Sequence, residues 1–188
     1  MGHKCGSVSP IALIFLALTL LILPLPWVGA MLLAMAIHEG SHYLAIRLCG
    51  GVAGQIRVGM NGIQMEVGNL NVWQELICAL AGPLGGFLLF FTAHWLPRTA
   101  VCGGFQSLFN LLPVYPLDGG RALRCCSELL FSPKISARFC CYTEMVCLSG
   151  ILCLGIYAAF GLRLGLMPIG IALLLFHRSF AGKIPGTL

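Results

Sequence analysis

Long apolar stretches alternate with short polar connections along the chain. The apolar stretches lie at about residues 11–26, 27–48, 72–96, 100–117, 138–160 and 164–180. Most are close to the ~20 residues that a helix needs to cross about 30 Å of hydrocarbon. The pattern therefore predicts an all-α polytopic membrane protein with about six transmembrane helices. The first stretch has a second interpretation, because a secretory signal peptide has the same composition.

Residues 55–67, between the second and third stretches, break the helical pattern. Apolar residues occupy every second position from 56 to 60 and again from 63 to 67. Between them stands Asn61–Gly62, a dipeptide that favours a two-residue type I′ turn. The pattern predicts a small β-hairpin. The hairpin is either a plain connector or an edge strand that can hold an extended peptide by adding it to the sheet.

The composition supports a membrane protein and excludes several soluble classes. Hydrophobic residues make up 59% of the chain and charged residues 9%, whereas roughly a quarter of residues are charged in an average soluble domain. We expect residues 1–188 to form a single membrane-embedded domain. The net charge of +5 fits contact with an anionic lipid bilayer. No basic stripe interleaved with aromatic residues indicates a nucleic-acid partner.

Basic residues give the orientation of the predicted spans, since short cytoplasmic loops are enriched in Lys and Arg. With six spans, Arg98 and Arg163 fall on one side and the other Lys and Arg residues fall on the opposite side. Both termini are therefore expected to be cytoplasmic. The ten cysteines form no C-x-x-C pair, and we interpret them as small apolar residues rather than as disulfide or zinc-ribbon partners.

An ionisable cluster, His38, Glu39 and His42, interrupts one of the most apolar stretches. On a helix, residues four apart share a face, so the two imidazoles can bind one metal ion. The H-E-x-x-H spacing supplies two zinc ligands and a carboxylate placed to take a proton from metal-bound water. The alternative is a pair of buried histidines satisfied by backbone carbonyls. That alternative requires a partner in lipid for the Glu39 carboxylate as well.

The third ligand of such a site is predicted to be Asp118, the one aspartate in the chain. A catalytic zinc takes three protein ligands and keeps a position open for water. Pro113 and Pro116 kink or unwind the helix that precedes Asp118, and Gly119–Gly120 permits a turn that alanine could not make. Irregular backbone at membrane depth faces protein or a water-filled cavity. We therefore expect one zinc ion per chain, held by both histidines and this carboxylate.

Two motifs resemble the paired motifs of the site-2 protease family, the intramembrane zinc metalloproteases. They are HEGSH at residues 38–42 and NLLPVYPLDGG at residues 110–120, and AGPLGG at 81–86 resembles the family's third-helix motif. The resemblance covers about residues 28–130. It is closest to the bacterial branch of stage IV sporulation protein FB. We expect neither the CBS domain of that branch nor the PDZ domain of larger bacterial members.

The resemblance implies hydrolysis of a peptide bond in or near a transmembrane segment of a membrane-tethered protein, known as regulated intramembrane proteolysis. Glu39 is the implied general base. Asn110 is implied to contact the substrate backbone or the developing oxyanion, with helix capping or packing as the open alternative. A regulatory membrane protein and a location in the bacterial plasma membrane follow from the same likeness.

Two other functions remain open. A divalent-metal transporter also places histidine and acidic residues within the membrane, although transporters usually repeat such ligands in two halves and no repeat is visible here. An inactive family member that only binds membrane proteins is the second. The intact ligand set and Glu39 argue against it.

Two further features carry less information. Gly82, Pro83, Gly85 and Gly86 form either a helix-packing surface or a gate for substrate, and packing is the commoner role of small residues in membrane helices. Glu144 falls within the fifth apolar stretch. Its carboxylate is expected to face the helix bundle, but the sequence assigns it no role.

Overall fold

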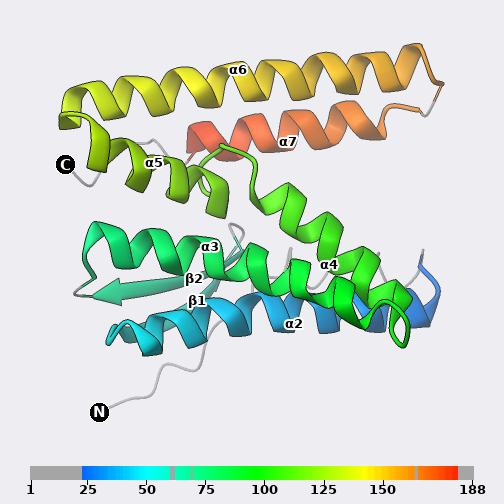
Figure 1. Ribbon diagram of the computed structural model, residues 1–188. Helices are drawn as coiled ribbons and strands as arrows, with labels where there is room; N and C mark the ends of the chain where they lie inside the picture. The colour runs from blue at the N-terminus through cyan, green and yellow to red at the C-terminus, as the bar shows by residue number, and fades with distance from the viewer. Residues whose placement is uncertain (1–22, 60–61, 69, 164, 182–188) are drawn as a thin grey trace. The chain divides into compact units, whose positions relative to one another are not determined.

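The computed structural model describes residues 23–59, 62–68, 70–163 and 165–181 (Figure 1). The chain divides into two compact units, the first ending at Asn110 and the second beginning at Leu111. Helices make up most of the described residues. The first predicted span, 11–26, and its interpretation as a signal peptide lie almost wholly outside the described residues.

Three helices pack against one another in the first unit. They are α2 (Leu25–Leu48), α3 (Val72–Leu88), which continues into the 3-10 helix η1 (Leu89–Thr92), and α4 (Pro97–Asn110). Each of α2, α3 and α4 contacts the other two (Figure 1). Pro26 lies in the first turn of α2, where a missing N–H removes no helical hydrogen bond. The helix therefore begins slightly before the predicted residue 27.

The strands β1 (Val52–Gly59) and β2 (Gly62–Gly68) pair antiparallel between α2 and α3. A turn centred on Asn61–Gly62 would pair Met60 with Ile63, but Ile63 pairs with Val58 and Gly62 with Gly59. Gly62 is therefore a strand residue of β2, and the predicted place of the turn is wrong. Apolar residues are paired with apolar residues across the strands in both registers, so a period of two cannot distinguish between them.

Small residues of α3 lie where the neighbouring helices approach it. A Cβ atom at Gly85 would overlap the Ser41 hydroxyl of α2, and one at Gly86 would overlap the Ser107 hydroxyl of α4. Only glycine leaves room for those side chains at this separation. These contacts are the packing role that the sequence favoured for the small residues.

The second unit contains α5 (Asp118–Leu130), α6 (Pro133–Phe160) and α7 (Met167–Ala181). The predicted fourth stretch, 100–117, is too long as a helix, because α4 ends at Asn110 and residues 111–117 form turns before α5. Pro113 and Pro116 lie in this non-helical segment and cannot donate the hydrogen bonds that a helix needs. The amphipathic α5 was not predicted, since it is too short and too polar for a span.

Two helical stretches of the described residues are long and apolar enough to cross a membrane. They are Val72–Thr92, with 21 residues, and Pro133–Phe160, with 28. The length of each exceeds or matches the ~20 residues required. The count of about six spans goes beyond these two helices and stays a prediction.

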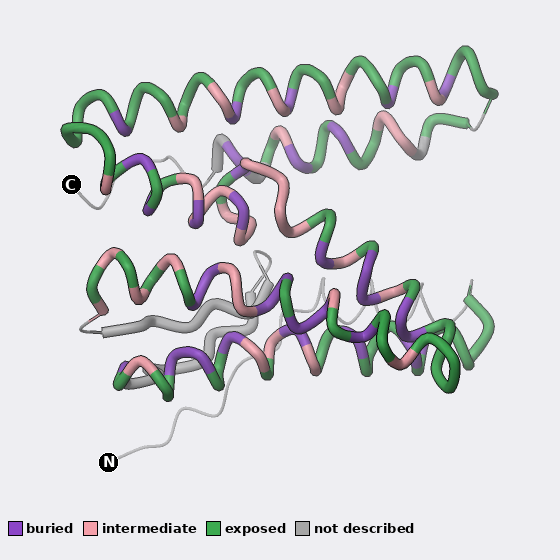
Figure 2. Tube along the Cα trace, in the orientation of Figure 1, coloured by how far each residue is buried: buried purple, intermediate pink, exposed green. Residues whose placement is uncertain are grey.

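The core of the second unit joins the non-helical segment to α6 and α7. Val114, Leu148 and Leu175 form a buried apolar cluster, and the first two are each 1% exposed. The buried positions of α6 recur at helical spacing along one side of it (Figure 2). The segment before Asp118 is therefore held by side-chain packing as well as by its own turns.

Truncation of this cluster tests its contribution to stability. Leu148→Ala should lower the free energy of unfolding by about 2–5 kcal/mol, because it leaves a cavity in a packed core. Leu154→Ala, on the same helix but 68% exposed, is the matched control and should change it far less. Thermal unfolding in detergent, followed by circular dichroism, measures both. Equal shifts in the two variants would contradict the described core.

Candidate metal centre

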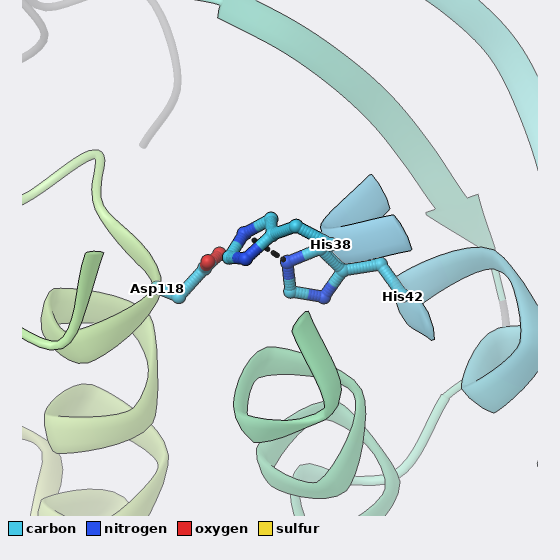
Figure 3. Close-up of side chains that lie close together, drawn as sticks. All are labelled: His38, His42 and Asp118. Atoms are coloured by element: carbon cyan, nitrogen blue, oxygen red, sulfur yellow. Dashed lines mark hydrogen bonds between the residues drawn. The ribbon is translucent and has the colours of Figure 1, made fainter. Parts of the chain in front are cut away.

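His38 and His42 lie one turn apart on α2 and both side chains are buried. Their rings are nearly perpendicular, with an interplanar angle of 83° and centroids 4.9 Å apart. The two Nε2 atoms are 3.3 Å apart (Figure 3). The helical spacing thus brings one nitrogen of each imidazole to a common point, as residues four apart on a helix allow.

The hydrogen bond made by His42 Nδ1 leaves Nε2 as the nitrogen that faces His38. His42 Nδ1 lies 2.7 Å from the backbone oxygen of Cys78 on α3. A carbonyl can only accept, so Nδ1 carries the proton and donates it, which leaves the lone pair of the neutral ring on Nε2. A histidine that ligates a metal is typically oriented by such a hydrogen bond from its other nitrogen.

The separation of the two Nε2 atoms also fits metal binding. At 3.3 Å it is long for a hydrogen bond. Two nitrogens bound at about 2.0–2.1 Å to a tetrahedral zinc ion lie about 3.4 Å apart. The pair therefore has the spacing of two ligands of one zinc ion.

Gly82 makes room for the His42 ring. A Cβ atom at this position of α3 would overlap His42 Nε2, and it would lie 2.5 Å from Cε1 of the same ring. No side chain larger than hydrogen fits there unless the imidazole moves, because real Cβ contacts are not that short. The first glycine of the AGPLGG motif thus shapes the centre directly.

Asp118 is the first residue of α5 and follows the non-helical segment 111–117. The two glycines after it do not form the predicted turn, since both are helical residues of α5. Their role is close approach. A Cβ atom at Gly119 would overlap the backbone oxygen of Leu111, and one at Gly120 would lie 2.6 Å from the backbone carbon of Val114. The segment folds back against the first turn of α5, which only glycine permits.

His38, His42 and Asp118 form a group that could bind a metal ion. Each offers one ligand atom, and these atoms all lie within 4.8 Å of one another (Figure 3). Two imidazole nitrogens and one carboxylate oxygen are a donor set found in catalytic zinc sites. The three residues are those that the sequence predicted as ligands.

The two other predicted residues lie beside the histidines. Glu39 is half-buried and follows His38 on α2. Asn110 is the last residue of α4, and its amide nitrogen is 3.3 Å from His38 Nε2. An amide at this place can donate a hydrogen bond to a group bound at the histidines. The position also agrees with the alternative of a residue at a helix end.

Two features of the structure were not found in the sequence. The carbonyl of Cys78 orients His42, and a backbone group leaves no signal in the residue types. The carboxylate of Glu144 accepts a hydrogen bond from the backbone N–H of Tyr115. The sequence pointed to this hydrogen bond only through the presence of an acidic residue in an apolar stretch.

Comparisons with known proteins show the fold. No protein-family model and no curated protein matches the chain. A solved structure described as the site-2 protease from Methanocaldococcus jannaschii is similar, with a TM-score of 0.63 and 18% sequence identity. The similarity covers 94% of this chain and 88% of that chain. The chain thus has the fold of a site-2 protease.

Substitution of Gly82 tests the packing of the His42 ring. Gly82→Ala should displace the imidazole and lower zinc affinity by about tenfold or more, the scale seen when the support of a metal ligand is removed. Competition with a chromophoric chelator measures the affinity. Gly29→Ala on α2, where a Cβ atom would meet nothing within 4 Å, is the control and should bind zinc as the parent does. Unchanged affinity in Gly82→Ala would contradict the described geometry.

Proposed function

We propose that this protein is an intramembrane zinc metalloprotease of the site-2 type. It hydrolyses a peptide bond in or near a transmembrane segment of a membrane-tethered protein. The observation that carries the proposal is the grouping of His38, His42 and Asp118 with Glu39 in the same turn of α2. The similarity in fold to a solved structure supports the proposal, because that structure is described as a site-2 protease.

Each residue of the centre has a proposed role. His38, His42 and Asp118 hold one zinc ion per chain. Zinc, when bound, supplies a Lewis acid that activates water at neutral pH. The Glu39 carboxylate takes a proton from the attacking water and delivers it to the leaving amine.

Asn110 acts on the substrate. Its amide nitrogen lies 3.3 Å from His38 Nε2, so a carbonyl held next to the histidines comes within reach of its N–H. A donor at that place stabilises the negative charge that develops on the carbonyl oxygen. We propose this role over helix capping because the amide is directed at the histidine.

The proposed setting is the bacterial plasma membrane, with about six spans and both termini cytoplasmic. The uneven distribution of Lys and Arg supports this orientation. We propose that the chain belongs near the branch of stage IV sporulation protein FB, which the motifs at residues 38–42 and 110–120 resemble. We propose a membrane-tethered substrate and a regulatory membrane protein on the same basis.

Loss of the base tests the reaction. Glu39→Gln, co-expressed with candidate single-pass membrane proteins, should lower cleavage by about 10²–10⁴-fold, the usual contribution of a general base. Its zinc content should equal that of the parent, since Glu39 is not a proposed ligand. Glu128→Gln on α5, which removes an acid paired with Arg124, is the control and should cleave normally. Full cleavage by Glu39→Gln would rule out the proposed mechanism.

The same variant separates the protease from a transporter. In proteoliposomes, a metal transporter should move zinc whether or not Glu39 can accept a proton from water. Zinc uptake by both the parent and Glu39→Gln, with no cleavage by either, would replace the proposed function with transport. Zinc bound by the parent without cleavage of any co-expressed candidate would favour the inactive binding protein.

Removal of the carboxylate ligand tests the metal centre itself. Asp118→Ala should retain less than one zinc ion per chain after dialysis against a weak chelator, because two imidazoles alone hold zinc poorly. Metal analysis of the purified protein measures this content. Glu128→Ala serves as the control for loss of an acidic side chain and should retain the metal. Full retention by Asp118→Ala would show that another group is the third ligand.

A further inference from the structure

Glu144 is a buried carboxylate in the middle of the long apolar helix α6. Its side chain is 5% exposed, and it shares the buried side of α6 with Leu148 and Gly155. A carboxylate removed from water is costly unless hydrogen bonds compensate it. Within apolar helices such a residue usually has a specific task.

The hydrogen bonds of Glu144 show where this carboxylate acts. Its Oε1 atom accepts a hydrogen bond from the backbone N–H of Tyr115, at 3.2 Å. The same oxygen accepts a second from the hydroxyl of Ser179 on α7, a side chain that is 1% exposed. One oxygen therefore joins the non-helical segment before α5 to both α6 and α7.

The Tyr115 N–H needs such an acceptor. It lies between Pro113 and Pro116, where the chain has left α4 and has not yet entered α5. The neighbouring Val114 is only 1% exposed and packs against Leu148. A backbone N–H beside a packed core is costly when it is left without a hydrogen bond.

The path from Tyr115 to Asp118 is short and is crossed by backbone hydrogen bonds. The N–H of Leu117 donates to the Val114 oxygen at 2.9 Å, and the N–H of Arg121 donates to the Leu117 oxygen at 3.1 Å. These bonds join the segment to the first turn of α5, which Asp118 begins. The backbone around Tyr115 is thus joined by hydrogen bonds to the helical turn that carries Asp118.

We propose that Glu144 is a positioning residue for the metal centre: by holding the Tyr115 backbone, it sets the direction in which Asp118 presents its carboxylate to the metal. Ser179 holds the Glu144 carboxylate in place from α7. This inference rests on the proposed function only in taking Asp118 as a metal ligand. Glu144 itself touches neither metal nor substrate.

Two substitutions at Glu144, made in the full-length protein, test the proposal. Glu144→Leu removes the acceptor, and Glu144→Gln keeps an oxygen that can accept from Tyr115 and Ser179. We expect Glu144→Leu to lower zinc affinity about 10–100-fold, as changes around metal ligands do. Glu144→Gln should stay within about threefold of the parent. Equal losses in the two variants would overturn the assignment, because the acceptor would then not be what matters.

The visible spectrum of the cobalt-substituted protein adds a readout that simple destabilisation does not change. Displacement of a carboxylate ligand alters the intensity and position of the cobalt bands, since these depend on coordination number and geometry. Glu144→Leu should show altered bands even when saturated with cobalt, and Glu144→Gln should show those of the parent. Parental bands and parental zinc affinity in Glu144→Leu would overturn the proposal.

Gly155→Ala is the control for weakened packing of α6 against α7. Its Cβ atom would lie 3.1 Å from the Pro168 oxygen, about three helical turns from Glu144. It should lower thermal stability and leave the cobalt spectrum unchanged. Spectra altered alike in Gly155→Ala and Glu144→Leu would reduce Glu144 to a general structural role. A parent protein that binds no metal would instead contradict the proposed function, so the two failures are distinct.

Discussion

The candidate centre depends on the close approach of α2 and α3 at Gly82. The imidazole of His42 occupies the space that a side chain at Gly82 would fill, and its Nδ1 proton is donated to the Cys78 carbonyl one turn earlier on α3. Together these contacts fix the ring plane and the tautomer. The His42 Nε2 atom then lies 3.3 Å from His38 Nε2. A larger residue or a wider helix separation would lose the orientation and the lone-pair direction together.

Backbone groups contribute much to this arrangement because its polar side chains are buried among apolar ones. An imidazole or carboxylate buried among apolar side chains must find hydrogen-bond partners within the protein. His42 uses a carbonyl of α3, and Glu144 uses the N–H of Tyr115 in a segment where two prolines interrupt the helix. Each bond satisfies a buried group and also fixes a position. Stability and preorganisation of the centre therefore have the same source.

The sequence predicted the ligand-bearing helix well because a spacing of four residues determines which side chains share a helical face. His38 and His42 needed no tertiary information to be paired. Other features depended on such information. Apolar alternation fits two registers of the hairpin, so the place of Gly62 in β2 was missed. The conformation of Gly119 was also missed, because a glycine required for close approach has the same sequence signal as one required for a turn.

The two parts of the proposed ligand set have different structural supports. The histidine pair is held within the first unit by α2 and α3, whereas the segment that bears Asp118 is held within the second unit by Val114 packing and by Glu144. Metal affinity then depends on two frameworks that are stabilised separately. If Asp118 is the carboxylate ligand, as we propose, a change confined to α6 or α7 should weaken that ligand and leave the imidazoles in place. Because Ser179 of α7 donates to the Glu144 oxygen that accepts from Tyr115, two hydrogen bonds connect the last described helix to the segment that precedes Asp118.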